Sequence, residues 1–218
     1  RETIRALGLE GKSAAQVGCN NARELLSLAS LKVIPSVGID QSGAFLEQGR
    51  VLAKAAGLEP RLIEADIYDL PDDVGTFDLV LVTIGVLNWM PDLGGFFRVI
   101  AGLLGPGGHL LVYETHPVME MFDPESDTPH EPAISYFRTD PLKEEGLISY
   151  DGVDHGSGET GYWFIHTLGQ IVTSCATAGM TITSLKEFGY SIREPEYDVY
   201  EGREAQIPMS YLLHARKM

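Results

Sequence analysis

Short apolar runs alternate with amphipathic stretches along the first half of the chain, a spacing that predicts alternating strands and helices. Strands are predicted at residues 13–18, 32–39, 61–65, 77–84 and 109–114. Helices are predicted at residues 2–7, 22–29, 42–56 and 93–104, the third beginning at an N-cap Ser42 and ending at Gly57. The run at 77–84 is almost entirely apolar, which is typical of a strand buried on both faces of a parallel sheet. The alternation indicates βαβ units in a doubly wound α/β sheet.

The alternation stops after residue 116. Residues 117–161 are rich in Pro, Gly, Asp and Tyr and show no long helical period. A connection of that length is usually a binding loop or an added subdomain, so we expect a lid or insertion at about 117–165. Beyond it, the pattern predicts a helix at 168–178 and two antiparallel closing strands at 180–187 and 209–216. We expect residues 1–218 to form one domain.

Charge and composition exclude several classes of partner. The chain has 31 acidic residues against 16 Lys and Arg, a formal net charge of −15, which disfavours nucleic acids and anionic membranes as partners. The longest apolar run is shorter than the ~18 residues that span a bilayer. The two cysteines form no disulfide framework, and neither they nor the histidines have metal-ligand spacing, so we expect a cytoplasmic protein without a metal. Because the chain begins at Arg1, we expect a segment to precede it.

Small and polar residues follow the first two predicted strands, at the edge where an open α/β sheet binds ligands. Gly18-Cys19-Asn20-Asn21 predicts a tight turn whose backbone can approach a ligand, although many strand–helix turns contain a glycine. Asp40 lies about 20 residues after Gly18, the spacing of an acid that accepts hydrogen bonds from ribose hydroxyls. A carboxylate at that position also suits the N-terminus of the following helix, and the two uses are compatible.

The next two strand ends carry further candidates. Asp66 can accept a hydrogen bond from an adenine amino group while Ile67 packs on the ring, although an aspartate there also suits a turn beside Asp69. The backbone of Thr83, Ile84 and Gly85 follows the buried strand and would face the other end of a ligand that starts at Asp66.

These strand ends together resemble the class I S-adenosylmethionine-dependent methyltransferases, in particular bacterial enzymes that act on small molecules. The resemblance is carried by residues 16–28, Gly38-Ile39-Asp40-Gln41-Ser42, residues 64–71, Phe77-Asp78-Leu79-Val80, residues 86–93, Leu103-Leu104-Gly105-Pro106-Gly107-Gly108 and the tail 207–213. It implies a Rossmann-like, doubly wound sheet of seven strands, mostly parallel with an antiparallel last strand, in three α/β/α layers. It also implies S-adenosylmethionine as the cofactor, with S-adenosylhomocysteine as the product. The implied cofactor-binding residues are Gly18, Cys19, Asn20, Asn21, Asp40, Gln41, Asp66, Ile67, Thr83 and Ile84.

The sequence departs from the family in its first turn. The usual Gly-x-Gly-x-Gly reads Gly18, Asn20 and Ala22 here, and Gln16 stands where the family has an acid. Asparagine tolerates a left-handed backbone, so Asn20 and Asn21 can hold the turn, whereas Ala22 adds a methyl group where helix packing or ligand approach is close. The same turn lacks the G-x-G-x-x-G pattern of dinucleotide-binding proteins.

Methyl transfer from a sulfonium needs mainly proximity and orientation, and a base helps only where the acceptor loses a proton. His116 and His166 are the candidate bases; the alternative is that one caps a strand end and the other bonds backbone at a helix start. Candidate walls of an acceptor pocket are Trp89, Tyr136, Tyr162 and Trp163, which can equally form the small core of the insertion.

The sequence therefore predicts methyl transfer from S-adenosylmethionine to a small organic acceptor, at O, N or C. A nicotinamide-dependent oxidoreductase and a non-catalytic protein of the same fold, acting in ligand binding or assembly, are the alternatives. The oligomeric state stays open, with a homodimer as one option.

Overall fold

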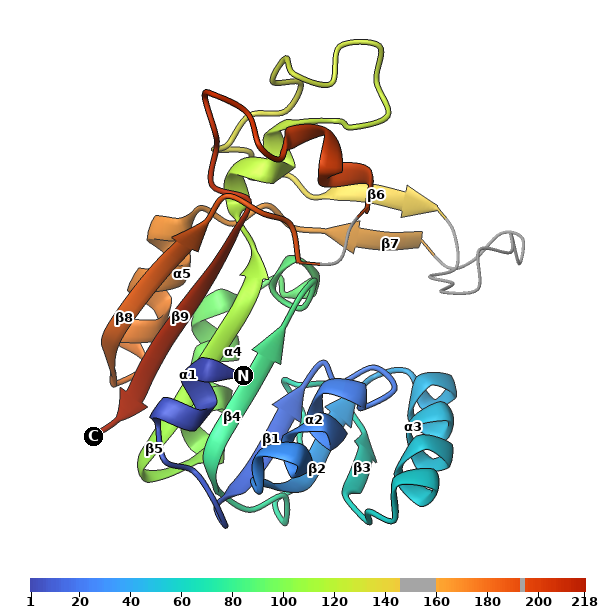
Figure 1. Ribbon diagram of the computed structural model, residues 1–218, viewed down its shortest axis with the longest axis vertical. Helices are drawn as coiled ribbons and strands as arrows, with labels where there is room; N and C mark the ends of the chain where they lie inside the picture. Colours follow the sequence, from blue (N-terminus) through green and yellow to red (C-terminus); the bar gives the residue numbers. More distant parts are fainter. Residues whose placement is uncertain (146–159, 193–194) are drawn as a thin grey trace.

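The computed structural model describes residues 1–145, 160–192 and 195–218, and its centre is a seven-stranded sheet in the order β3-β2-β1-β4-β5-β9-β8 (Figure 1). Its strands are β1 (Ser13–Val17), β2 (Ile34–Asp40), β3 (Arg61–Glu64), β4 (Phe77–Thr83), β5 (Leu104–Thr115), β8 (Met180–Phe188) and β9 (Ser210–Lys217). Strands β1 to β5 pair in parallel, whereas β9 pairs antiparallel with both β5 and β8. The predicted fold class is confirmed.

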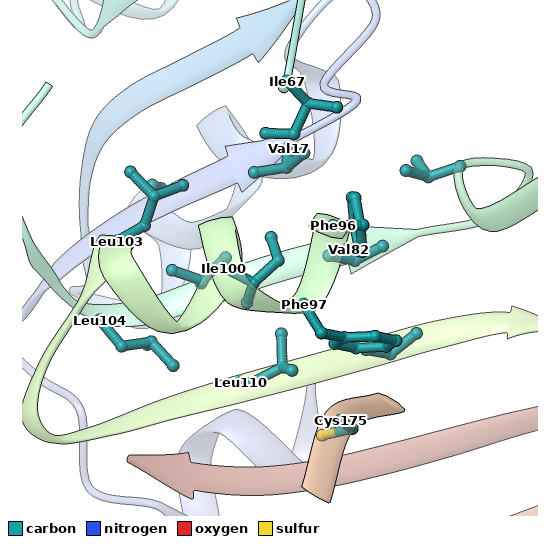
Figure 2. Close-up of a cluster of buried hydrophobic side chains, with 14 of the residues drawn as sticks. Val17, Ile67, Val82, Phe96, Phe97, Ile100, Leu103, Leu104, Leu110 and Cys175 are labelled. Carbon is teal, nitrogen blue, oxygen red and sulfur yellow. The ribbon is translucent and has the colours of Figure 1, made fainter. Parts of the chain in front are cut away.

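Helices cover both faces of this sheet and give three layers. They are α1 (Glu2–Ala6), α2 (Arg23–Ser27), α3 (Gly43–Ala56), α4 (Leu93–Leu103) and α5 (Leu168–Thr177). Strand β4 is buried on both faces because its side chains alternate between two cores: Leu79 and Leu81 join the α2–α3 side, and Val80 and Val82 the α4–α5 side. Figure 2 shows the second core, where Phe96, Phe97 and Ile100 of α4 lie over the sheet. No helix in the described residues is long and apolar enough to cross a membrane.

The predicted helix boundaries are confirmed most closely in α3. The Ser42 hydroxyl accepts a hydrogen bond from the Phe45 N–H at 3.4 Å, which caps the helix, and Gly57 ends it with a left-handed φ of 66°. The run Gly105-Pro106-Gly107-Gly108 has the composition of a sharp turn, but the structure places it within a strand. Strand β5 begins at Leu104, directly after α4, and its register with β4 shifts between Phe77 and Leu79, so these residues form a bulge within the strand pair.

The predicted insertion contains a small antiparallel ribbon, β6 (Leu142–Glu145) paired with β7 (Thr160–Trp163), separate from the main sheet. Its central part, residues 146–159, lies outside the described residues. Two short 3-10 helices, η3 (Pro117–Met121) and η4 (Pro195–Tyr200), share a core of Met119, Tyr200 and Met209. The insertion and the connection between β8 and β9 therefore form one cover, which lies beyond the carboxyl ends of β4 and β5 (Figure 1).

Two stacked histidines lie between β5, β9 and β8. His109 Nδ1 is 2.9 Å from His214 Nε2, His214 Nδ1 is 2.6 Å from Thr183 Oγ1, and that hydroxyl donates to the His214 carbonyl. These three hydrogen bonds require a proton on Nδ1 of each histidine. His214 Nε2 must then be unprotonated, so that it accepts the hydrogen bond from His109 Nδ1. Burial lowers the pKa of both imidazoles, and the positive charge of Arg216 lowers it further. Both rings are therefore neutral in the folded protein at pH 7.

The histidine chain predicts a loss of stability in mild acid. Because the folded pKa of each ring lies below the unfolded value of about 6.5, the unfolded chain binds more protons as the pH falls below that value. The free energy of unfolding should be constant above pH 7.5 and decrease between pH 6.5 and 5.5. Urea unfolding followed by tryptophan fluorescence measures this, and H109Q should reduce the dependence. An unfolding free energy equal at pH 7.5 and 5.5 would contradict it.

Candidate functional site

A cavity of about 540 Å³ opens at the carboxyl ends of β1, β2, β3 and β4, where an open α/β sheet holds its ligand. Among the predicted cofactor residues, Gly18, Asn20, Asp40, Gln41, Asp66, Ile67 and Ile84 line it. Trp89 lines it as well. Cys19, Asn21 and Thr83 are not among the lining residues. The structure thus brings together residues from all four predicted strand ends.

The turn after β1 has three left-handed residues in alternation, and they are those at the family's three glycine positions. Gly18, Asn20 and Ala22 have φ angles of 61°, 49° and 58°. Glycine adopts this backbone without strain and asparagine at low cost, whereas alanine has no compensating side-chain hydrogen bond. At Gly18 space is also short, because a Cβ there would lie 2.4 Å from Val86 Cγ2. All three positions therefore have a left-handed backbone, although two of them are not glycine.

Gln16 stands where the family has an acid, and its side-chain hydrogen bonds connect β1 with β4 and α2. Its Nε2 donates to Thr83 Oγ1 at 3.0 Å, and its Oε1 accepts the Leu25 N–H of α2 at 2.8 Å. This explains why the Thr83 hydroxyl faces the sheet interior. Cys19 is also directed inward: it is fully buried, and its Sγ packs against the backbone of Gly38.

Asp40 holds two parts of the cavity wall at the end of β2. Its Oδ2 accepts the Asn20 N–H at 2.6 Å, and its Oδ1 accepts the Ser42 N–H at 2.9 Å. Each carboxylate oxygen has two lone pairs, so each can accept a further hydrogen bond from a ligand hydroxyl. The carboxylate thus orders the glycine-type turn and presents acceptors to the cavity.

The β3 end forms the far wall of the cavity. Asp66 Oδ1 accepts the Tyr68 N–H at 2.9 Å, and the Tyr68 hydroxyl donates to the Asp92 carbonyl at 3.0 Å. Ile67 lies between them with its side chain largely buried. The lining residues that the sequence did not indicate as candidates are Val17, Ile39, Ser42, Phe45, Ala65, Tyr68, Val86, Met90 and Pro91. Phe45 had a usable signal, since side chains in the first turn of a helix point back toward its N-terminus.

Glu114, near the end of β5, binds the loop after β4 through hydrogen bonds from the loop's backbone N–H groups. Glu114 is 2% exposed and accepts three backbone N–H groups: Gly85 at 2.6 Å, Val86 at 2.8 Å and Leu87 at 3.1 Å. Gly85 and Val86 line the cavity. Glu114 therefore fixes the backbone of this wall.

The same loop is tied in front to the chain that leaves β7. The Phe164 N–H donates to the Asn88 carbonyl at 2.7 Å, and Asn88 Nδ2 donates back to the Phe164 carbonyl at 3.0 Å. The Trp89 and Trp163 rings meet edge to face, with centroids 5.2 Å apart. Trp163 Nε1 donates to Glu120 of η3 at 2.8 Å. The cavity wall and the cover are thus one connected structure.

Neither candidate base lines the cavity. His116 is buried: its Nδ1 accepts the Val118 N–H at 3.1 Å, so its Nε2 carries the proton and donates to Glu187 at 3.0 Å. Burial lowers its pKa. His166 Nε2 donates to the Met90 carbonyl at 2.8 Å, and burial lowers its pKa too. His116 therefore bonds groups at the end of β5, and His166 bonds backbone ahead of α5, as the structural alternative for each residue predicts.

The remaining acceptor candidates lie at different depths in the cover. The Tyr136 hydroxyl accepts the Leu168 N–H at the start of α5, and Tyr162 is 46% exposed.

Among the residues that the structure describes, no group of three His, Cys, Asp or Glu side chains is arranged to hold a metal ion.

Comparison with protein families identifies the part of the chain that builds this cavity. Residues 15–112 match a family described as a methyltransferase domain. The matched range is somewhat less than half of the chain. It contains most of β1, all of β2, β3 and β4 and most of β5, and with them every residue that lines the cavity. The part of the chain that builds the cavity is therefore similar to methyltransferase domains.

Curated relatives share only part of their length with this chain. A demethylmenaquinone methyltransferase of Thermus thermophilus is 40% identical over 84 residues, which are 37% of this chain and 36% of that protein. One of Staphylococcus epidermidis is 31% identical over 117 residues, 52% of this chain and 47% of that protein. The chain thus matches less than half of the length of these relatives.

Solved structures resemble the whole chain in fold. A putative S-adenosylmethionine-dependent methyltransferase from Listeria monocytogenes has a TM-score of 0.69 at 18% identity, covering 96% of this chain and 92% of that one. One from Methanosarcina mazei has a TM-score of 0.69 at 16% identity, covering 100% and 98%. A [4+2]-cyclase has a TM-score of 0.62 at 18% identity, covering 100% and 80%. At these identities the likeness concerns the fold alone.

Substituting Gly18 should disturb the cavity through a steric clash. G18A places a methyl group against Val86 and should lower the free energy of unfolding by about 1–3 kcal/mol, as overpacking does, and should weaken binding of S-adenosylhomocysteine. Urea unfolding and calorimetry measure the two effects.

G8A is the matched control, because Gly8 has a φ of 66° and a Cβ there would meet nothing within 4 Å. It carries the same backbone strain without the clash. Equal losses of stability in G18A and G8A would show that the contact with Val86 is unimportant.

Proposed function

We propose that this protein transfers the methyl group of S-adenosylmethionine to a small organic acceptor. The observation that carries the proposal is the Asp40 carboxylate at the end of β2, inside the cavity and beside the left-handed turn at Gly18 and Asn20. A carboxylate there suits the two ribose hydroxyls of an adenosyl group. The turn brings backbone close to the ligand without a phosphate-binding glycine pattern.

The sheet order gives the donor a direction within the cavity. Strands β3, β2, β1 and β4 lie side by side in that order. With the ribose on Asp40 at β2, the adenine lies at the β3 end, where Asp66 offers an acceptor and Ile67 an apolar surface. The methionine part then extends across β1 toward the β4 loop, at Ile84 and Gly85. The methyl group faces the side on which Trp89 and the cover lie.

The reaction that fits this arrangement is an in-line displacement. The acceptor atom forms a bond to the methyl carbon while the carbon–sulfur bond breaks, and its electron pair stays on the sulfur of S-adenosylhomocysteine. Among the described residues that line the cavity, none is a His, Lys or Cys, and both predicted histidine bases are bonded elsewhere. We therefore assign the rate enhancement to proximity, orientation and exclusion of water by the cover.

For the acceptor we propose a flat hydroquinone-type ring, methylated at a ring carbon. The C–H bond at that carbon then breaks: its electron pair restores the aromatic ring and its proton passes to solvent water. Two observations support this class. The named activity of the curated relatives is demethylmenaquinone methylation. The edge-to-face pair of Trp89 and Trp163 places an aromatic surface between the cavity and the cover, where such a ring can pack. Trp89 lies within the family-matched range and Trp163 beyond it, so the aromatic pair joins that range to this chain's own cover.

Binding measurements test the cofactor. Calorimetry should detect S-adenosylmethionine and S-adenosylhomocysteine but not NAD, and D40A should weaken adenosyl binding by about 1–3 kcal/mol, as loss of a hydrogen-bonded charge does. D72A is the control, since Asp72 is exposed and does not line the cavity. Binding of NAD alone would favour the oxidoreductase alternative. Binding of none would favour the non-catalytic one.

Methyl transfer tests the acceptor class. With labelled S-adenosylmethionine and 1,4-dihydroxynaphthalene as a soluble probe, the protein should form the ring-methylated product. W163A should lower kcat/KM for this probe about tenfold, the order of one aromatic contact, and leave the affinity for S-adenosylmethionine within about twofold.

F137A is the control for that variant, because Phe137 is an aromatic residue of the same cover with 77% of its surface exposed. It should methylate the probe at the wild-type rate. If the wild-type protein binds S-adenosylmethionine but leaves the probe unmethylated, the hydroquinone class is wrong and the cofactor assignment stands.

A further inference from the structure

Glu114 is the buried acid closest to the cavity wall that no step of the proposed reaction uses. Its side chain lies at the carboxyl end of β5, 2% exposed, on the face that carries α4 and α5. Both of its oxygens accept N–H groups, Oε2 from Gly85 and Oε1 from Val86 and Leu87. Acceptance by both oxygens is the behaviour of a carboxylate.

The partners of Glu114 form one wall of the cavity. Gly85 and Val86 line it, and the Val86 side chain also packs against Gly18 across the cavity floor. Because their N–H groups point at Glu114, the carboxylate lies directly behind a single layer of backbone. Its contact distances of 2.6 to 3.1 Å to these nitrogens fix the loop as a unit.

This wall is at the sulfonium end of the proposed donor. The order β3-β2-β1-β4 places adenine, ribose and methionine in sequence across the sheet, and the Gly85 loop follows β4. A negative charge at this depth interacts with a sulfonium more strongly than a charge in water does, because little solvent lies between them. A neutral thioether receives no such stabilisation.

We propose that Glu114 is a positioning residue for the methyl donor with a second, electrostatic effect, an inference that rests on the proposed function. Through three backbone amides it sets the wall at the sulfonium, and its charge behind that wall favours S-adenosylmethionine over S-adenosylhomocysteine. The carboxylate thus supports binding of the charged donor and release of the neutral product. It acts through the loop and does not touch the reacting atoms.

Calorimetry on E114Q separates this effect from a structural one. Glutamine keeps the size of the side chain, loses the charge and retains one oxygen acceptor. The affinity for S-adenosylmethionine should fall about tenfold more than the affinity for S-adenosylhomocysteine. Equal losses for both ligands, or no loss for either, would overturn the electrostatic effect.

E187Q is the matched control. Glu187 lies on β8, separated from Glu114 only by Tyr211 of β9, and it contacts His116 and not the cavity loop. The same change of Glu to Gln there should leave the ratio of the two affinities unchanged. A shift in this ratio equal to that of E114Q would show that the effect is not specific to the wall.

E114D provides a second test, and serves if E114Q does not fold. Aspartate keeps the charge but is one methylene too short to reach all three amides, so both ligands should bind more weakly with the ratio preserved. Wild-type affinity for both ligands in E114D would overturn the positioning role. If the wild-type protein itself binds no S-adenosylmethionine, the proposed function fails; if it binds and the variants behave as wild type, only the inference fails.

Discussion

One kind of interaction holds both loops that form the cavity: a carboxylate at the end of a strand accepts backbone N–H groups from a neighbouring loop. Asp40 does this for Asn20 and Ser42, and Glu114 does it for Gly85, Val86 and Leu87. Hydrogen bonds to an ionised acceptor are stronger than neutral ones, so each acid can fix a loop with little other support. The Gly18 turn and the Val86 side chain are in direct contact, and both line the cavity.

The cavity is lined by residues at the ends of the sheet strands β1 to β4 and in the segments that follow them. The cover lies on the side where we place the acceptor. The hydrogen bonds between Asn88 and Phe164 and the Trp89–Trp163 contact join the two. This division matters for function, because a [4+2]-cyclase shares the fold, and a fold alone does not determine a reaction. Trp163, one of the two rings of the proposed acceptor surface, lies outside the family-matched residues.

The sequence predicted the strands of the main sheet and about half of the residues that line the cavity. Strand β4 and helix α3 have strong local signals, an almost entirely apolar run in one and the Ser42 and Gly57 boundaries in the other. The glycines at 105–108 gave an ambiguous signal, since the same residues suit a turn and a bulge. The sequence could not give the hydrogen-bond partners of His116 and His166, because Glu187 and Met90 are distant from them along the chain.

The strand ends that carry Gly18, Asp40 and Asp66 could be located from the amino-acid pattern alone, because hydrophobic periodicity and turn residues are local properties of the chain. Which acids hold the loops follows from the packing of distant elements. Glu114 and His116 are close together at the end of β5, yet the first side chain contacts the β4 loop and the second contacts β8. Such a choice depends on which distant backbone groups are left without hydrogen bonds when the elements pack, and that is settled only by packing.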